Sequence, residues 1–231
     1  MRLDPGDTGG DTSGGTGGGT GGGSGSGTGT TAPTSFSPIG IATNGNDVFL
    51  TSPGEGIVLK LNRYSTTPQV IPFPDPTCYP LDLAVKTNAN STTSSVWVTE
   101  NHSGKIASIS ALDLTITEYF VGGDPTAICK SSDGAMWYTK TSFGKIGKIE
   151  ATGAFQEFAV GTSVYGICQD TTGLIWYTKQ FPARIGSMTS SGVVTELRLP
   201  NENSVPTAIR AFADGTVWYS DSYLGVIVRA K

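Results

Sequence analysis

One pair of side chains in this chain could do chemistry together. Glu100 and His102 stand two residues apart at the end of the run Trp97-Val98-Thr99-Glu100-Asn101-His102. Residues at this spacing in an extended strand point to the same side, so a carboxylate and an imidazole would lie side by side. An imidazole can act as a base or as a metal ligand. His102 is the single histidine of the chain, and a loop histidine without a chemical role is the alternative interpretation.

A second set of polar residues stands three positions after each of five regularly spaced aromatic residues. In a closed repeat fold, equivalent positions form a ring on one face, near a central channel. Such a ring could be a polar ligand site at the channel mouth. Ion pairs between neighbouring repeats, such as Glu100 with Lys140, are the interpretation that we favour. Three glutamates, Glu118, Glu157 and Glu196, are expected on a solvated outer face. The ring residues are Ser52, Glu100, Lys140, Lys179 and Asp221.

The elements that must position these residues are internal repeats. The repeats align on an aromatic residue, with spacings of 48, 40, 39 and 42 residues. This period suits a four-stranded propeller blade. Each aromatic side chain is expected to fill the space between two blades. These residues are Phe49, Trp97, Trp137, Trp176 and Trp218.

Each repeat contains four short segments with strand character, separated by turns rich in Gly, Asn and Asp. The sequence therefore predicts an all-β fold, a β-propeller of about five four-stranded blades. The last blade lacks a fourth strand, and its open edge needs a partner. Residues from about 30 to 37, from the same or a neighbouring molecule, could supply it. The predicted repeats are approximately 38–77, 78–123, 124–162, 163–204 and 205–231.

The N-terminal part differs from the rest in composition. Residues 1–34 are rich in Gly, Thr and Ser and have almost no apolar side chain to bury, whereas residues 35–231 carry the repeats. Such a segment cannot offset its ordering entropy alone. We expect an extended tail that serves as a linker or as an assembly arm.

Composition excludes several classes of function. The formal net charge is −4 without a basic cluster, which argues against nucleic acid as a partner. No apolar run is long enough to span a membrane, and no secretory signal is visible.

Two glycosylation sequons, at Asn90 and Asn101, favour an extracellular or cell-surface protein with possible glycans. Cys129 and Cys168 recur at one repeat position and are expected to be small buried side chains rather than a disulfide.

The repeats resemble a known family. The pattern Asp-Gly-x-x-Trp-Tyr/Val-Thr-Glu/Lys, then Gly-Lys-Ile-Gly-Lys-Ile, then Ile-Thr-Glu-Tyr, is similar to the repeats of virginiamycin B (streptogramin) lyase-like β-propellers over residues 38–231. The resemblance implies a magnesium site of Glu and His side chains and a further histidine that acts as the base, opening a cyclic depsipeptide by elimination. Glu100 and His102 match this motif, but the chain has one histidine where that chemistry uses two.

Three functions follow as hypotheses. The first, which we favour, is a non-enzymatic extracellular propeller without a metal or cofactor that self-assembles through its tail, as an oligomer or a filament. The second is a lyase-like enzyme that uses magnesium with Glu100 and His102. The third is a monomeric ligand-binding propeller with a flexible tether. The sequence identifies no ligand and does not decide whether the ring closes within one chain.

Overall fold

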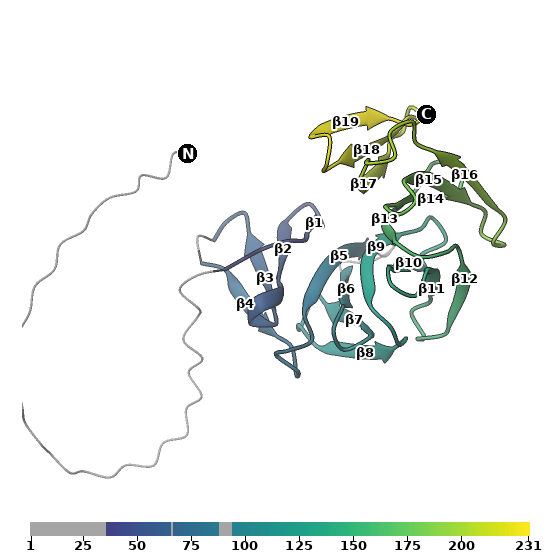
Figure 1. Ribbon diagram of the computed structural model, residues 1–231. Helices are drawn as coiled ribbons and strands as arrows, with labels where there is room; N and C mark the ends of the chain where they lie inside the picture. The colour runs from purple at the N-terminus through teal and green to yellow at the C-terminus, as the bar shows by residue number, and fades with distance from the viewer. Residues whose placement is uncertain (1–35, 66, 88–93) are drawn as a thin grey trace, which may run out of the picture. The chain divides into compact units, whose positions relative to one another are not determined.

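The fold consists of antiparallel β-sheets. The computed structural model describes residues 36–65, 67–87 and 94–231, in which nineteen strands form five sheets and one short 3-10 helix, η1 (Pro53–Glu55), follows the second strand (Figure 1). The all-β fold with five repeats is therefore confirmed. The tail predicted for residues 1–34 and the sequon at Asn90 lie outside the described residues.

Each of sheets 1 to 4 has four strands that pair in sequence order, whereas sheet 5 has three. The strands are β1 (Ile41–Thr43), β2 (Asp47–Ser52), β3 (Ile57–Asn62) and β4 (Gln69–Pro72) in sheet 1; β5 (Pro80–Thr87), β6 (Ser94–Glu100), β7 (Lys105–Ser110) and β8 (Ile116–Phe120) in sheet 2; β9 (Pro125–Lys130), β10 (Met136–Lys140), β11 (Lys145–Ile149) and β12 (Phe155–Ala159) in sheet 3; β13 (Val164–Gln169), β14 (Ile175–Lys179), β15 (Arg184–Met188) and β16 (Val194–Arg198) in sheet 4; β17 (Pro206–Ala211), β18 (Val217–Asp221) and β19 (Val226–Arg229) in sheet 5. The first strands of successive sheets, β1, β5, β9, β13 and β17, lie next to one another.

A buried threonine hydroxyl joins each sheet to the next. Thr139 Oγ1 on β10 donates to the Tyr165 carbonyl of sheet 4 at 2.7 Å and accepts the Ala127 N–H of its own sheet at 3.1 Å. The ladder between β9 and β10 is irregular here, which leaves that N–H without a backbone acceptor. Thr51, Thr99 and Thr178 make the same pair of bonds in sheets 1, 2 and 4.

The aromatic residues pack between sheets in most repeats. Phe49, Trp97 and Trp137 are at most 2% exposed, and each belongs to a cluster with side chains of the following sheet. Trp176 packs, partly buried, against sheet 5. Trp218 is instead 38% exposed, since no further sheet of the described chain covers that side of sheet 5. The expected role in blade packing therefore does not extend to Trp218.

The segment before β1 already belongs to sheet 1. Ser37 N–H donates to Ser52 Oγ at 3.1 Å, and Ile39 N–H donates to the Thr51 carbonyl at 3.1 Å. Ser37 therefore contacts the first sheet rather than supplying a strand to the last one.

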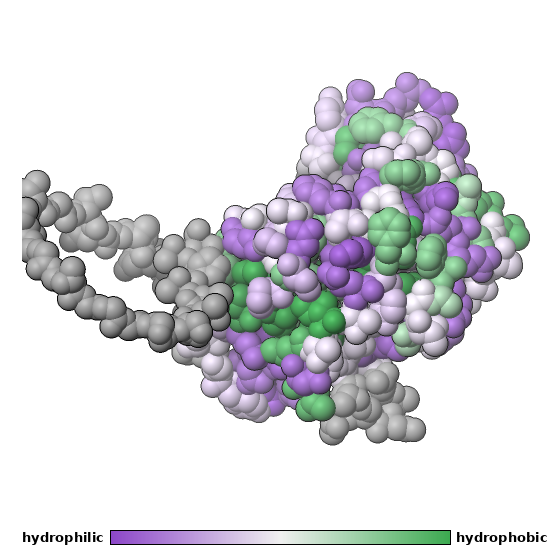
Figure 2. Space-filling model, turned by 90° about the horizontal axis from the view of Figure 1, so that it is seen from below, coloured by the Kyte–Doolittle hydropathy of each residue, from purple (hydrophilic) through white to green (hydrophobic). Residues whose placement is uncertain are grey.

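Large apolar side chains remain exposed, and sheet 5 carries many of them. On the face shown in Figure 2, apolar side chains gather in one larger area and are otherwise interspersed with polar ones. The described residues include no helix with both the length and the hydropathy needed to span a membrane. The exposed apolar side chains of sheet 5 and its turns are Phe212, Trp218, Tyr223, Leu224, Val226 and Ile227.

Candidate functional site

Buried ion pairs lie at the ends of β10 and β14. Lys140 Nζ contacts the Glu157 carboxylate on the fourth strand of its own sheet. Lys179 Nζ likewise lies 3.1 Å from Glu196 Oε1, and it donates to the Val160 carbonyl at 2.7 Å. The predicted pair between repeats, Glu100 with Lys140, is therefore not formed. Each lysine is neutralised within its own sheet because the fourth strand brings a glutamate to it.

The glutamates on the fourth strands are not on a solvated face, contrary to the expectation. The side chains of Glu118, Glu157 and Glu196 are 21%, 16% and 17% exposed. Each also pairs with a cation at the start of the third strand, as Lys145 Nζ does with Glu157 at 2.6 Å. Burial alone would raise the pKa of Glu157, but hydrogen bonds from Lys140 and Lys145 outweigh it and lower that pKa. These glutamates are internal counterions.

Sheet 2 breaks this pattern, because Glu100 occupies the place of Lys140 and Lys179. Glu100 is fully buried, and its Oε2 accepts a hydrogen bond from Ser103 Oγ at 2.8 Å. The Glu118 carboxyl is close enough for its negative charge to act on Glu100. Oε1 of Glu100 and Oε1 of Glu118 are buried without a donor among the described residues. Lys105, 2.8 Å from Glu118, is the cation beside these two acids.

Burial and the neighbouring acids raise the pKa values of Glu100 and Cys78. Burial raises the pKa of Glu100 to about 7, the Ser103 hydrogen bond opposes this shift, and the negative charge of Glu118 adds to it. Burial, together with the negative charge of Glu100, raises the pKa of Cys78 to about 12. Glu100 can therefore take up or release a proton near neutral pH, whereas Cys78 stays a thiol.

His102 lies apart from the buried acid pair. Its imidazole is exposed and stacks on the Tyr79 ring, with 4.3 Å between ring centroids and 15° between planes. Strand β6 ends at Glu100 and residues 101–104 form a turn. The rule for residues two apart in a strand does not apply across a turn, which is why Glu100 points into the sheet while His102 faces solvent.

The predicted ring residues Ser52 and Asp221 form hydrogen bonds within their own repeats. Ser52 Oγ donates to the Glu55 carboxylate in the adjacent η1 turn. Asp221 Oδ1 accepts the N–H groups of Val205, Tyr223 and Leu224, each at 3.1 Å. The five residues Ser52, Glu100, Lys140, Lys179 and Asp221 thus have separate partners. The cavity between the sheets is lined by residues in and beside the first strands instead.

The side chains of the sequon residue Asn101 and of the three cysteines pack within the fold. Asn101 is half-buried, and its Nδ2, the atom that a glycan would modify, donates to the Pro125 carbonyl at 3.2 Å. Cys78, Cys129 and Cys168 are free thiols; Cys78 and Cys168 are buried, and Cys129 is half-buried.

The acid pair has the donor atoms that magnesium takes. Mg²⁺ in proteins is held by one or two carboxylates, together with water and ligand oxygens. Glu100 and Glu118 supply two carboxylates with one unbonded oxygen each. Within the described ranges, no group of three His, Cys, Asp or Glu side chains is arranged to hold a metal ion. The pair therefore supplies two carboxylate donors for a magnesium ion, but both free oxygens are buried, so water or a bound molecule could complete the coordination only if the end of sheet 2 opened.

Comparison with known proteins assigns the family. The model of the virginiamycin B lyase family matches residues 69–231. Among solved structures, a catalytically inactive histidine-to-alanine variant of virginiamycin B lyase from Staphylococcus aureus with quinupristin is 24% identical, with a TM-score of 0.78 over 87% of this chain and 69% of that chain. A streptogramin B lyase is 21% identical, with a TM-score of 0.54 over 83% of this chain and 82% of that one.

A chain of a nidogen/laminin complex shares the fold at 14% identity, with a TM-score of 0.66 over 83% of this chain and 74% of that chain. No curated protein matches the sequence. The family model covers well over half of the chain and includes Glu100, Glu118 and all of sheets 2 to 5. This chain belongs to the virginiamycin B lyase family.

Proposed function

We propose that this chain is a non-enzymatic interaction propeller, acting outside the cell, that associates with further copies of itself by taking up a strand along the outer edge of β19. The observation that carries the proposal is that sheet 5 has three strands where sheets 1 to 4 each have four, so the outer edge of β19 has no strand beside it within the described residues. Ile227 on β19 is exposed next to this edge. Its equivalents on the third strands, Ile106, Ile146 and Ile185, are at most 2% exposed, whereas Ile227 is 73% exposed.

The other sheets indicate what the missing strand has to supply. Opposite the buried isoleucines, the fourth strands place Tyr119, Phe158 and Leu197. A strand added beside β19 with an apolar residue at the matching position would place that side chain next to Ile227, whereas the equivalent isoleucines are also covered by the following sheet, as Ile106 is in its cluster with Ile128 and Met136. Main-chain hydrogen bonds along β19 would supply affinity, and this side chain would set the register.

The proposed occupant is the N-terminal segment of a second copy, from the residues before Phe36. Glycine allows a backbone to approach another surface closely, and this segment is rich in glycine. A contact between the N-terminal segment of one copy and sheet 5 of the next is heterologous, so it builds a filament unless the rotation closes a ring. The nidogen/laminin complex supports the proposal only in that a chain with this fold occurs there in a protein complex.

We expect the full-length chain to form oligomers whose size increases with concentration, and both removal of residues 1–35 and an Ile227→Lys substitution to yield monomers. A charge at Ile227 would lie beside the apolar side chain of the added strand and lose part of its hydration, which is unfavourable. Light scattering coupled to size-exclusion chromatography measures the mass. Val193→Lys, at a residue 65% exposed beside β16, is the matched control and should assemble normally. A truncated chain that still assembles, or a full-length chain that stays monomeric at high concentration, contradicts the proposal.

A second candidate function is lyase-like chemistry at sheet 2, favoured by the Glu100–Glu118 acid pair. Magnesium held by these carboxylates would polarise an oxygen of a bound molecule. Glu100 can hold a proton near neutral pH, and His102 is exposed on Tyr79, where it can accept a proton from a molecule on that surface. The similar S. aureus lyase was solved with quinupristin as a histidine-to-alanine variant, which makes quinupristin the substrate to test.

This candidate predicts magnesium-dependent ring opening of quinupristin, measured by chromatography and mass spectrometry. His102→Ala and Glu100→Gln should each reduce the rate at least tenfold, whereas Glu150→Gln, at an exposed acid on a turn of sheet 3, should not change it. The candidate is rejected if the wild-type chain opens no ring, or if the His102→Ala variant keeps the full rate.

A further inference from the structure

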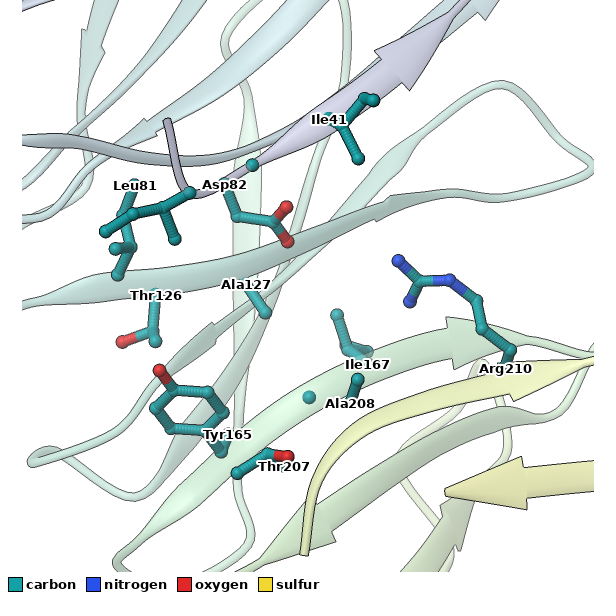
Figure 3. A pocket seen from close by; sticks show the side chains of 13 residues that line it. Ile41, Leu81, Asp82, Thr126, Ala127, Tyr165, Ile167, Thr207, Ala208 and Arg210 are labelled. Carbon is teal, nitrogen blue, oxygen red and sulfur yellow. The ribbon is translucent and has the colours of Figure 1, made fainter. Parts of the chain in front are cut away.

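A cavity of about 260 Å³ lies where the first strands of all five sheets meet (Figure 3). This volume is below the range of about 300–1,000 Å³ typical of sites for drug-sized molecules. The cavity therefore suits a small ligand. Two of its lining residues, Asp82 on β5 and Arg210 on β17, carry opposite charges and point toward one another across it.

Both charged residues are exceptions within the repeats. The position of Asp82 is occupied in the other sheets by Gly40, Ala127, Gly166 and Ala208, whose N–H groups donate to the equivalent hydroxyl, as the Asp82 N–H does. The position of Arg210, opposite the aromatic residue of the second strand, is otherwise Ala42, Ala84, Cys129 or Cys168. Small residues suit the close approach of inner strands, so packing of the sheets does not account for the acid at Asp82. Arg210 lies on the side of sheet 5 that no further described sheet covers, where a long side chain has room to reach the cavity.

The Asp82 carboxylate is held in a fixed orientation and retains acceptor capacity. Oδ1 accepts the Leu83 N–H at 2.9 Å, and Oδ2 accepts the Ile128 N–H of the neighbouring sheet at 2.9 Å. Each oxygen keeps a free lone-pair site. Burial raises the pKa of Asp82, while the two N–H bonds and the Arg210 charge oppose that shift. A cation from a ligand would stabilise the ionised form.

Most N–H donors of the Arg210 guanidinium are available to a ligand. Its Nη1 donates to the Ile209 carbonyl at 2.9 Å, and no ion pair between Arg210 and an acid is formed in the part of the chain that the structure describes. A guanidinium carries five N–H groups and binds a carboxylate through two of them. Beside these groups, Ile39 and Ile41 line the cavity with 59% and 66% of their surfaces exposed, an apolar wall with space next to it.

We infer that this cavity binds a small zwitterion of the α-amino acid class. The ammonium group lies on Asp82, the carboxylate lies on Arg210, and an apolar side chain packs against Ile41. The pairing of one fixed acid and one exposed base across a small cavity selects for a molecule that carries both charges. This site is separate from the edge of β19 and from the Glu100–Glu118 pair, so it holds whether or not either proposed function does.

Titration calorimetry on the full-length chain tests this inference with three probes: leucine, 4-methylpentanoate, which lacks the amine, and 3-methylbutylamine, which lacks the carboxylate. We expect leucine to bind, and each analogue to bind at least tenfold more weakly. Asp82→Asn and Arg210→Gln should each weaken leucine binding at least tenfold. Asp113→Asn and Arg229→Gln, at exposed charges outside the cavity, should leave it unchanged.

Arg210 is exposed, so its substitution should leave a folded chain, and Arg210→Lys, which keeps the charge but not the two-pronged geometry, should bind leucine with intermediate affinity. The inference is overturned if none of the three probes binds, if either analogue binds as tightly as leucine, or if the Arg210→Gln variant binds leucine like the wild-type chain.

Discussion

Alanine in place of Gly166 is expected to lower the free energy of unfolding by about 3 kcal/mol or more. A Cβ atom at Gly166 on β13 would lie 2.1 Å from the Thr207 carbonyl oxygen on β17, where the two inner strands approach. That carbonyl accepts the Thr178 hydroxyl at 2.8 Å, so it cannot move away without losing the bond that joins sheets 4 and 5. Urea unfolding followed by tryptophan fluorescence measures the change.

Gly54→Ala is the matched control for this prediction. A Cβ atom at Gly54 would meet no heavy atom within 4 Å, so the substitution should change the free energy of unfolding by less than about 0.5 kcal/mol. Equal stabilities of the Gly166→Ala and Gly54→Ala variants would mean that sheets 4 and 5 are not packed as closely as described.

The stability of the wild-type chain is expected to decrease as pH rises from about 4.5 to about 7, and Glu100→Gln should abolish this part of the dependence. The folded-state pKa of Glu100, about 7, lies above the ordinary value of 4.5. Between these values the folded chain binds a proton that the unfolded chain has released. The stabilisation is therefore complete below pH 4.5 and is lost as pH passes 7, by at most about 3 kcal/mol.

A glutamine amide stays neutral at every pH in this range, as the protonated acid is at low pH. The Glu100→Gln variant should therefore be more stable than the wild-type chain at pH 8 and nearly equal to it at pH 4.5. Thermal unfolding across this pH range gives the comparison, and Glu150→Gln, at an exposed acid, should follow the wild-type curve. A Glu100→Gln variant with the wild-type slope would show that the acid pair does not titrate in this window.

The sequence pointed to Glu100 for its neighbour His102, whereas the structure pairs it with Glu118. The repeats did contain a signal for that pair. Glu118, Glu157 and Glu196 recur on the fourth strands, and a cation opens each preceding third strand at Lys105, Lys145 and Arg184. A side-by-side alignment of these positions would have matched Lys140 and Lys179 with a glutamate in their own repeats and left Glu100 facing an acid.

The sequence by itself determined the number of repeats, the order of their strands and most of the packing aromatics. These features are local, since each blade is a run of adjacent antiparallel strands. Its turns, and the alternation of side chains along its strands, are specified within about 40 residues. The three strand segments of the last repeat were visible in the same way.

Only the tertiary structure decided which charges meet. The turn after β6 separates Glu100 from His102, the pairing of β6, β7 and β8 joins Glu100 to Glu118, and the meeting of β5 with β17 places Asp82 opposite Arg210 across the cavity. Asp82 and Arg210 lie 128 positions apart in the sequence. No local pattern specifies such a pair, because their separation depends on how four successive sheets pack on one another.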